Sequence, residues 1–322
     1  TLRDLCYFYL IRAYKDVPYV TWPSKDDEQD FVVPATKFDD ILADLIRDLE
    51  EICAPTASKD WAVNRYKELG DITNTARITR VAVWALLADM YLWQGNWDKC
   101  IDYCEKVIAQ KNKDYKELKE KQGADCVIEL YNDLPLIKES LGSSATGTAY
   151  NQIFGTGNSF ESLFELTFMP YQSTANSFVD NYYGTMSSNG SLCAFSQLMT
   201  GAKESTGNKY FKKYDSRWLE YMEEGSSANL IRKYVRASVT ADVIGLSPTV
   251  DDMLRPENQH ANWIIYRLSD VILMEAEAKV MKAKELVEGD EYNTLLHEAF
   301  LYTQAVNDRA INKKANSSAI SL

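Results

Sequence analysis

Apolar residues recur with a helical period along much of the chain. From Phe38 to Ile52 they fall at i, i+3, i+4, i+7, i+8, i+11 and i+14, and mainly acidic residues fill the positions between them. This spacing predicts an amphipathic helix that docks through one face. Residues 2–15 form a second, more aromatic helical segment. The following Asp16-Val17-Pro18 predicts a turn, because the residue before a proline avoids the helical conformation.

A tetratricopeptide-like pair of helices is predicted over residues 77–110. Trp84, Leu87, Ala88 and Tyr91 have the spacing of the first repeat helix, and Gly95-Asn96 supplies a tight turn. The second helix continues with a buried stripe of Trp97, Cys100, Ile101, Cys104, Val107 and Ile108. A further pair is predicted over residues 263–282 and 291–312. The pairs begin near residues 1, 77 and 263, so helical repeats are present but do not follow the regular period of about 34 residues.

The segment between these pairs, residues 111–262, differs in composition. It contains 11 of the 14 glycines and 10 of the 20 tyrosines of the chain, with small polar stretches at 142–148 and 184–191. Such stretches favour turns and surface loops, and the run 163–168 predicts a short strand in a small hairpin. We therefore expect a single, mainly α domain over 1–322, with helical-repeat portions at 1–110 and 263–312. The loop-rich insertion at 111–262 would carry minor β structure and the binding residues.

Charge and chemistry exclude several classes of function. The chain has 35 Lys and Arg against 47 Asp and Glu, a net charge of −12, which disfavours nucleic acid or an anionic membrane surface as a partner. The two histidines lie in no metal-binding motif, and Gly155-Thr156-Gly157 lacks the third glycine of a dinucleotide loop. The six cysteines are interpreted as small buried residues. We expect no catalytic site, no metal and no cofactor.

Four segments together resemble a known family. They are residues 2–20 (LRDLCYFYLIRAYKDVPYV), Arg77-Ile78-Thr79 with the following WALLADMYLW, residues 159–165 (SFESLFE) and residues 266–278 (YRLSDVILMEAEA). In this order they are similar to conserved blocks of SusD/RagB-like outer-membrane nutrient-binding lipoproteins. Members of that family carry a lipidated N-terminal region before the first block and a further block after the last. The resemblance therefore predicts that the chain is truncated at both ends.

The resemblance implies a non-catalytic protein anchored by lipid to the outer face of the outer membrane. The lipid anchor would lie in an N-terminal region absent from this chain. Such proteins cap a SusC-like TonB-dependent transporter and capture oligosaccharides for import. Within the family, the RagB-like branch captures oligopeptides instead, and that alternative stays open. From the residues alone, a tetratricopeptide scaffold for protein tails and an acidic glycoside hydrolase are further alternatives.

Sugar rings present apolar C–H faces and polar hydroxyl rims, so a glycan site favours Tyr and Trp beside polar side chains. The insertion contains three such groups, although a half-buried packing aromatic is the commoner interpretation of each. The predicted ligand-binding residues are Tyr182 and Tyr183 beside Asp180 and Asn181, Trp218 beside Arg217, and Tyr234, which follows Lys233.

Overall fold

The computed structural model describes the helical portions and parts of the insertion. The described residues are 1–23, 32–54, 63–139, 148–168, 176–184, 190–195, 215–224, 229–235, 237–240, 249–253 and 261–311. Most of them are helical, which confirms the predicted fold class. Within them, no helix combines the length and the apolarity needed to cross a bilayer.

The two helices predicted at the N-terminus are confirmed. Helix α1 (Leu2–Tyr14) ends before the short strand β1 (Val17–Pro18), which pairs with β2 (Ala35–Thr36) ahead of α2 (Phe38–Cys53). The apolar stripe of α2 faces inward as the pattern predicts, with Ile41, Leu42, Leu45, Ile46 and Leu49 buried.

The tetratricopeptide-like pair consists of α4 (Arg80–Gln94) and α5 (Trp97–Gln122). Gly95 adopts a left-handed conformation with φ of 77°, and the side chain of Asn96 accepts a hydrogen bond from the Lys99 N–H at 3.2 Å. The expected end of this pair at residue 110 is wrong, because α5 continues for a further three turns. Its buried face extends to Lys111 and Asp114, whose polar side chains ended the apolar pattern in the sequence.

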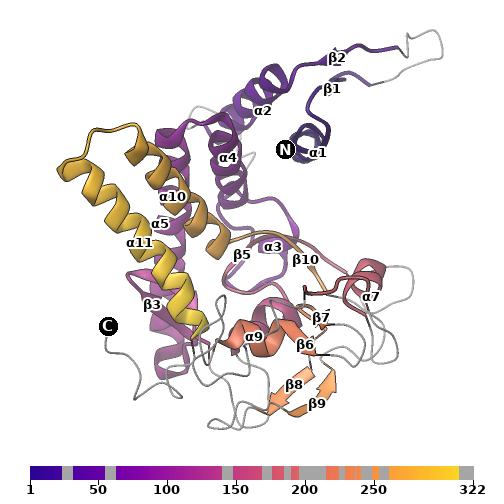
Figure 1. Ribbon diagram of the computed structural model, residues 1–322, viewed down its shortest axis with the longest axis vertical. Helices are drawn as coiled ribbons and strands as arrows, with labels where there is room; N and C mark the ends of the chain where they lie inside the picture. The colour runs from indigo at the N-terminus through magenta and orange to yellow at the C-terminus, as the bar shows by residue number, and fades with distance from the viewer. Residues whose placement is uncertain are drawn as a thin grey trace.

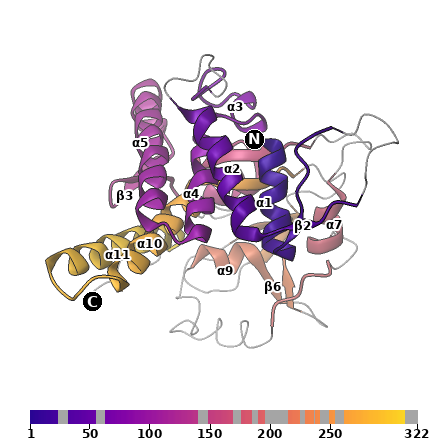
Figure 2. The same cartoon turned by 90° about the horizontal axis from the view of Figure 1, so that it is seen from above.

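The C-terminal pair consists of α10 (Leu268–Lys284) and α11 (Asp290–Ala310). Residues 263–267, predicted as the first turns of a helix, instead form strand β10 (Trp263–Arg267). The helix begins at the following residue, where the Asp270 carboxylate accepts the Arg267 N–H at 3.1 Å and caps it. Helices α1, α2, α4 and α5 stand side by side in that order, and α10 packs on both α5 and α11 (Figures 1 and 2).

The strand predicted within 163–168 forms as β5 (Ser162–Leu166), but it does not make a local hairpin. It pairs antiparallel with β10, with Trp263 opposite Leu166 and Arg267 opposite Ser162. The chain therefore leaves β5 at Leu166 and comes back beside it at Trp263 of β10. The remaining described pairs are hairpin-like: β3 (Ile128–Tyr131) with β4 (Leu134–Ile137), β6 (Met222–Glu224) with β7 (Asn229–Ile231), and β8 (Ala237–Thr240) with β9 (Thr249–Met253).

Short helical segments also occur before and within the insertion. Before it lies α3 (Thr73–Ala76). Within it lie a 3-10 turn at Gly123–Asp125, α6 (Thr148–Tyr150), a π-helical turn at Asn151–Thr156, α7 (Ser177–Tyr183) and α9 (Ser216–Tyr221). In Figure 1, α9 and strands β6 to β9 gather at the end of the molecule opposite α1 and α2. The molecule thus has a helical part and a loop-rich part.

Each part has its own hydrophobic core. The larger core lies among α1, α2, α4, α5 and α10, and a smaller one lies within the loop-rich part, around Tyr150, Phe154, Val179 and Tyr234. A buried ion pair connects Glu161, the residue before β5, to the C-terminal helix: Arg309 Nη1 of α11 lies 2.9 Å from Glu161 Oε1. The same carboxylate accepts hydrogen bonds from the Ile137 N–H and the Ser269 hydroxyl, which holds three elements together.

The expectation that all six cysteines are buried is wrong. Cys100 and Cys104 lie in the core between helices, but Cys6 and Cys193 are exposed, and all six are free thiols. Among the described residues, no group of His, Cys, Asp and Glu side chains is arranged to hold a metal ion.

Candidate functional site

Two exposed aromatic rings stack on the solvent face of α7. Phe178 and Tyr182 are one helical turn apart, with ring centroids 5.6 Å apart and an interplanar angle of 15°. Phe178 is 60% exposed and Tyr182 is 40% exposed. Asn181, between them in sequence, is also exposed. The opposite face of the helix buries Val179 and Tyr183. The helix therefore presents a flat aromatic surface to solvent beside an amide side chain.

Contacts at both ends hold α7 in place. The Asn176 amide donates a hydrogen bond to the Ala261 carbonyl at 2.8 Å. At the other end, Ser191 and Leu192 donate backbone N–H bonds to the Asn181 and Tyr182 carbonyls, each at 2.9 Å. The intervening Gly190 allows this approach, because a Cβ atom there would lie 2.2 Å from the Tyr182 carbonyl oxygen. The aromatic surface is thus carried by a segment fixed at both ends.

Tyr234 does not present a ring to solvent, contrary to the expectation of a stacking surface there. It is 5% exposed and packs within the smaller core, where its ring stacks on Trp263 with centroids 5.6 Å apart. Tyr183, 9% exposed, meets the Tyr234 ring edge-on at 5.1 Å, and Phe154 does the same at 5.3 Å. Burial raises the pKa of the Tyr234 hydroxyl. These rings support α7 from behind.

The predicted pair of Arg217 and Trp218 lies on α9. Arg217 is two-thirds buried by its partners: its guanidinium holds the Asp215 carboxylate at 2.6 Å and donates to the Asn307 side chain of α11 at 3.2 Å. The Trp218 side chain lies outside the described residues. The structure thus brings Asn181, Tyr182, Tyr183 and Tyr234 together around α7, whereas Arg217 fastens α9 to the C-terminal helix.

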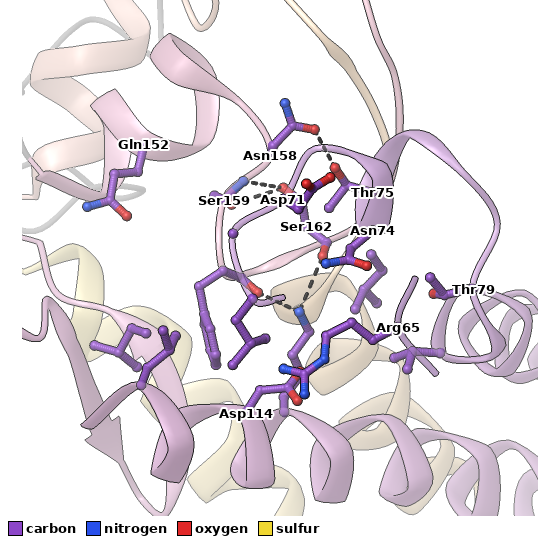
Figure 3. Close-up of a pocket in the computed structure, with 18 of the residues that line it drawn as sticks. Arg65, Asp71, Asn74, Thr75, Thr79, Asp114, Gln152, Asn158, Ser159 and Ser162 are labelled. Carbon is purple, nitrogen blue, oxygen red and sulfur yellow. Dashed lines mark hydrogen bonds between the residues drawn. The ribbon is translucent and has the colours of Figure 1, made fainter. Parts of the chain in front are cut away.

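A cavity of about 370 Å³, which the sequence did not predict, lies beside α5 (Figure 3). Its walls are the C-terminal half of α5, the segment 64–81 and the segment 152–163. In the view of Figure 3, Arg65 and Asp114 lie at the bottom, with Asn158 and Thr75 at the top and Gln152 to one side. None of the residues that line it lies on α7, so the cavity is separate from the aromatic surface.

A buried lysine contributes to the floor of this cavity. Lys111 Nζ donates to the Phe160 carbonyl at 2.6 Å and to the Ser162 carbonyl at 3.3 Å. Burial lowers the pKa of Lys111 to about 8, against the opposing effect of Asp114 and Glu161. Asp114, one turn further along α5, is also buried and accepts a hydrogen bond from the Gln110 amide at 2.9 Å. One sequence signal pointed here: Lys111 continues the buried stripe of Val107 and Ile108.

The opposite wall is ordered by a buried carboxylate. Glu165 of β5 accepts hydrogen bonds from the Asn158 N–H and the Asn262 amide, each at 2.9 Å, and from the Ser162 hydroxyl. Asn158 and the preceding Gly157 both have positive φ, and a Cβ atom on Gly157 would lie 2.6 Å from the Asn262 amide nitrogen. This turn lacks the third glycine of a dinucleotide-binding loop. It directs Asn158 toward Thr75, and the two side chains are hydrogen-bonded.

Comparison with known proteins gives the class of the protein. The sequence model of the SusD family matches residues 144–314, more than half of the chain. The chain belongs to the SusD family, as the four sequence blocks predicted. It is similar to SusD-like protein P25 of Formosa agariphila, with 23% identity over 96% of this chain. The match spans 54% of that relative, so the chain is about half as long as the curated protein it resembles.

Solved structures share the fold. A structure described as a laminarin-binding SusD-like protein superposes with a TM-score of 0.56 at 17% identity, covering 98% of this chain and 66% of the other. Surface glycan-binding protein A from Bacteroides uniformis superposes with a TM-score of 0.51 at 16% identity, covering 98% and 61%. At these identities the superpositions establish the common fold.

Proposed function

We propose that this protein binds oligosaccharides non-catalytically and delivers them to a SusC-like TonB-dependent transporter. Membership of the SusD family supports the proposal, as do the descriptions of two relatives of the same fold as laminarin-binding and glycan-binding. The observation that carries it is the stacked, exposed pair of Phe178 and Tyr182 on α7. Large exposed aromatic surface is uncommon on a soluble protein without a partner for it.

The proposed binding mode follows from the chemistry of sugars. A pyranose ring would lay its C–H face on Phe178 or Tyr182, and burial of this apolar area supplies the affinity. The Asn181 amide, with both donors and acceptors, would bind the hydroxyl rim. Tyr183 and Tyr234 hold the helix from behind, and Arg217 with Trp218 on α9 is proposed as a second, more distant contact. Phe178 joins the set because its ring stacks on Tyr182.

Affinity gel electrophoresis with laminarin, starch and xylan tests this proposal. Phe178→Ala and Tyr182→Ala are expected to abolish the retardation that the unchanged protein shows in its cognate polysaccharide. The matched control is Phe300→Ala, because Phe300 on α11 is also 60% exposed and lies on a different element. Equal retardation of all three variants would contradict the proposed site. Retention of oligopeptides in place of every glycan would favour the peptide-binding alternative.

The partner and the location are proposed on the same basis. We expect a lipid-anchored protein on the outer face of the outer membrane, in complex with the transporter. Affinity purification of the natural full-length protein from outer membranes should recover the transporter. Recovery of the protein from the periplasmic fraction alone would contradict this part of the proposal.

A further inference from the structure

The cavity beside α5 contains polar groups whose hydrogen-bonding capacity is only partly used. The Lys111 ammonium has three N–H donors, of which two are directed to the Phe160 and Ser162 carbonyls. Asp114 accepts one hydrogen bond, from Gln110. Although both residues are buried and one helical turn apart, no ion pair within 4.0 Å joins them among the described contacts. One ammonium donor and one carboxylate oxygen therefore remain for a third group.

Two amides extend this set across the cavity. The Asn158 carboxamide oxygen is hydrogen-bonded to Thr75, which leaves its NH₂ group as a donor. The Gln152 side chain lines the same space and makes no side-chain hydrogen bond within the described part of the chain. In Figure 3 the Asn158 NH₂ group points away from Asp114, and the Gln152 amide lies to one side of the cavity. Groups of both kinds on several walls suit a ligand that carries several hydroxyl groups, each of which can both donate and accept.

The charges and the apolar lining of the cavity further limit the class of ligand that it can bind. The Lys111 ammonium and the Asp114 carboxylate balance each other, and Arg65 is neutralised by Glu117 at 2.9 Å. A ligand with net charge would gain from one of these groups and be repelled by the other. Between the polar groups lie Val81, Phe160 and Leu163, which suit C–H surface. The cavity is at the small end of the range for ligand pockets, about 300 to 1,000 Å³. It reaches the surface beside Arg65, whose side chain is 34% exposed.

We propose that this cavity is a second binding site, for a neutral mono- or disaccharide. Two neighbouring hydroxyls of the sugar would connect Lys111 to Asp114, one accepting from the ammonium and the other donating to the carboxylate. The site is separate from the aromatic surface of α7 and does not depend on it. It would retain a small sugar mainly by hydrogen bonds, in contrast to the stacking proposed for longer chains.

Isothermal titration calorimetry tests the site with glucose, galactose, mannose, xylose, maltose and cellobiose as probes. We expect at least one to bind, and Asp114→Asn to weaken that binding roughly tenfold, because a neutral amide replaces the charged acceptor of a hydrogen bond. Leu118→Trp, which fills the cavity from α5, should abolish it. Asp102→Asn is the matched control, since Asp102 lies on the same helix in an exposed pair with Lys106 and should leave binding unchanged.

The outcomes distinguish this site from the one on α7. Phe178→Ala and Tyr182→Ala should leave the calorimetric affinity unchanged, whatever they do to polysaccharide retention. If circular dichroism shows that Leu118→Trp does not fold, the comparison of sugar affinity between Asp114→Asn and Asp102→Asn decides the question. The proposal is overturned if none of the sugars binds at millimolar concentration, if Asp114→Asn binds as the unchanged protein does, or if glycine and alanine bind in place of sugars.

Discussion

Tyr182 and Tyr183 are neighbours on α7 but lie in opposite environments. The ring of Tyr182 is 40% exposed and stacks on Phe178, whereas Tyr183 is 9% exposed and contacts Tyr234 in the smaller core. Consecutive helical residues differ by about 100° in direction, so the two rings of this pair cannot both face a ligand. The same residue type is therefore exposed at one position and a packing residue at the next.

A comparison of single substitutions separates these two roles. Tyr234→Ala removes a ring that packs against Phe154, Tyr183 and Trp263, and we expect it to lower the free energy of unfolding by about 3 to 5 kcal/mol. Tyr182→Ala removes an exposed ring and should change it by about 0.5 kcal/mol or less. Chemical denaturation monitored by circular dichroism gives both values. Equal losses for the two variants would mean that Tyr182 is also a packing residue.

The candidate site shows how far residue patterns could predict function. The sequence pointed to the segment that forms α7 because Asp180, Asn181 and two tyrosines are adjacent there. It could not tell which ring is exposed, because Tyr183 is covered by Tyr234, about fifty residues further along the chain. The cavity was not predicted at all, since Arg65, Lys111 and Asn158 come from three separate segments that only the tertiary fold brings together.

At the level of elements, the packing of α5, α10 and α11 encloses a titratable group. Glu275 of α10 is fully buried, with Lys279 Nζ 2.9 Å away, and Lys279 also lies 2.7 Å from Glu298 of α11. Burial raises the pKa of Glu275 to about 7, despite the attraction of Lys279, and Glu105 of α5 adds to the increase. Although burial opposes it, the two carboxylates raise the pKa of Lys279. Because Lys279 interacts with two carboxylates, its attraction does not offset the effect of burial on the pKa of Glu275.

This arrangement predicts that the three-helix packing weakens as the pH rises. Below the ordinary pKa of 4.5, Glu275 is protonated in both the folded and the unfolded chain. Between that value and about 7 the unfolded chain loses its proton first, so the contribution of Glu275 falls with rising pH, by up to about 3 kcal/mol. Glu275→Gln imitates the protonated form. Its stability relative to the unchanged protein, measured by urea denaturation at several pH values, should rise between pH 4.5 and 8. A constant difference would contradict the raised pKa.

Over the whole molecule, the helical pairs were predictable because their signals are local. Periodic apolar residues specify α2, and Gly95-Asn96 specifies the turn between α4 and α5. The pairing of β5 with β10 could not be predicted from the sequence, because it joins residues about a hundred positions apart and each strand is only five residues long. The part of the chain that carries α7 therefore begins after β5 and ends before β10, two strands that are adjacent in space.

The charge of the whole molecule provides a last test of how ligands are held. At a net charge of −12, binding of an ionic ligand would depend strongly on ionic strength, because salt screens exposed charges over about 10 Å at 0.1 M. Stacking of a neutral sugar on Phe178 and Tyr182 involves no charge. The dissociation constant for a neutral oligosaccharide should therefore change by less than about twofold between roughly 20 mM and 500 mM NaCl, since only exposed charges are screened. Calorimetry measures it directly, with the Phe178→Ala variant as the control for the site. A steep dependence on salt would instead mean that charged side chains dominate binding and would favour a peptide or an acidic glycan as the ligand.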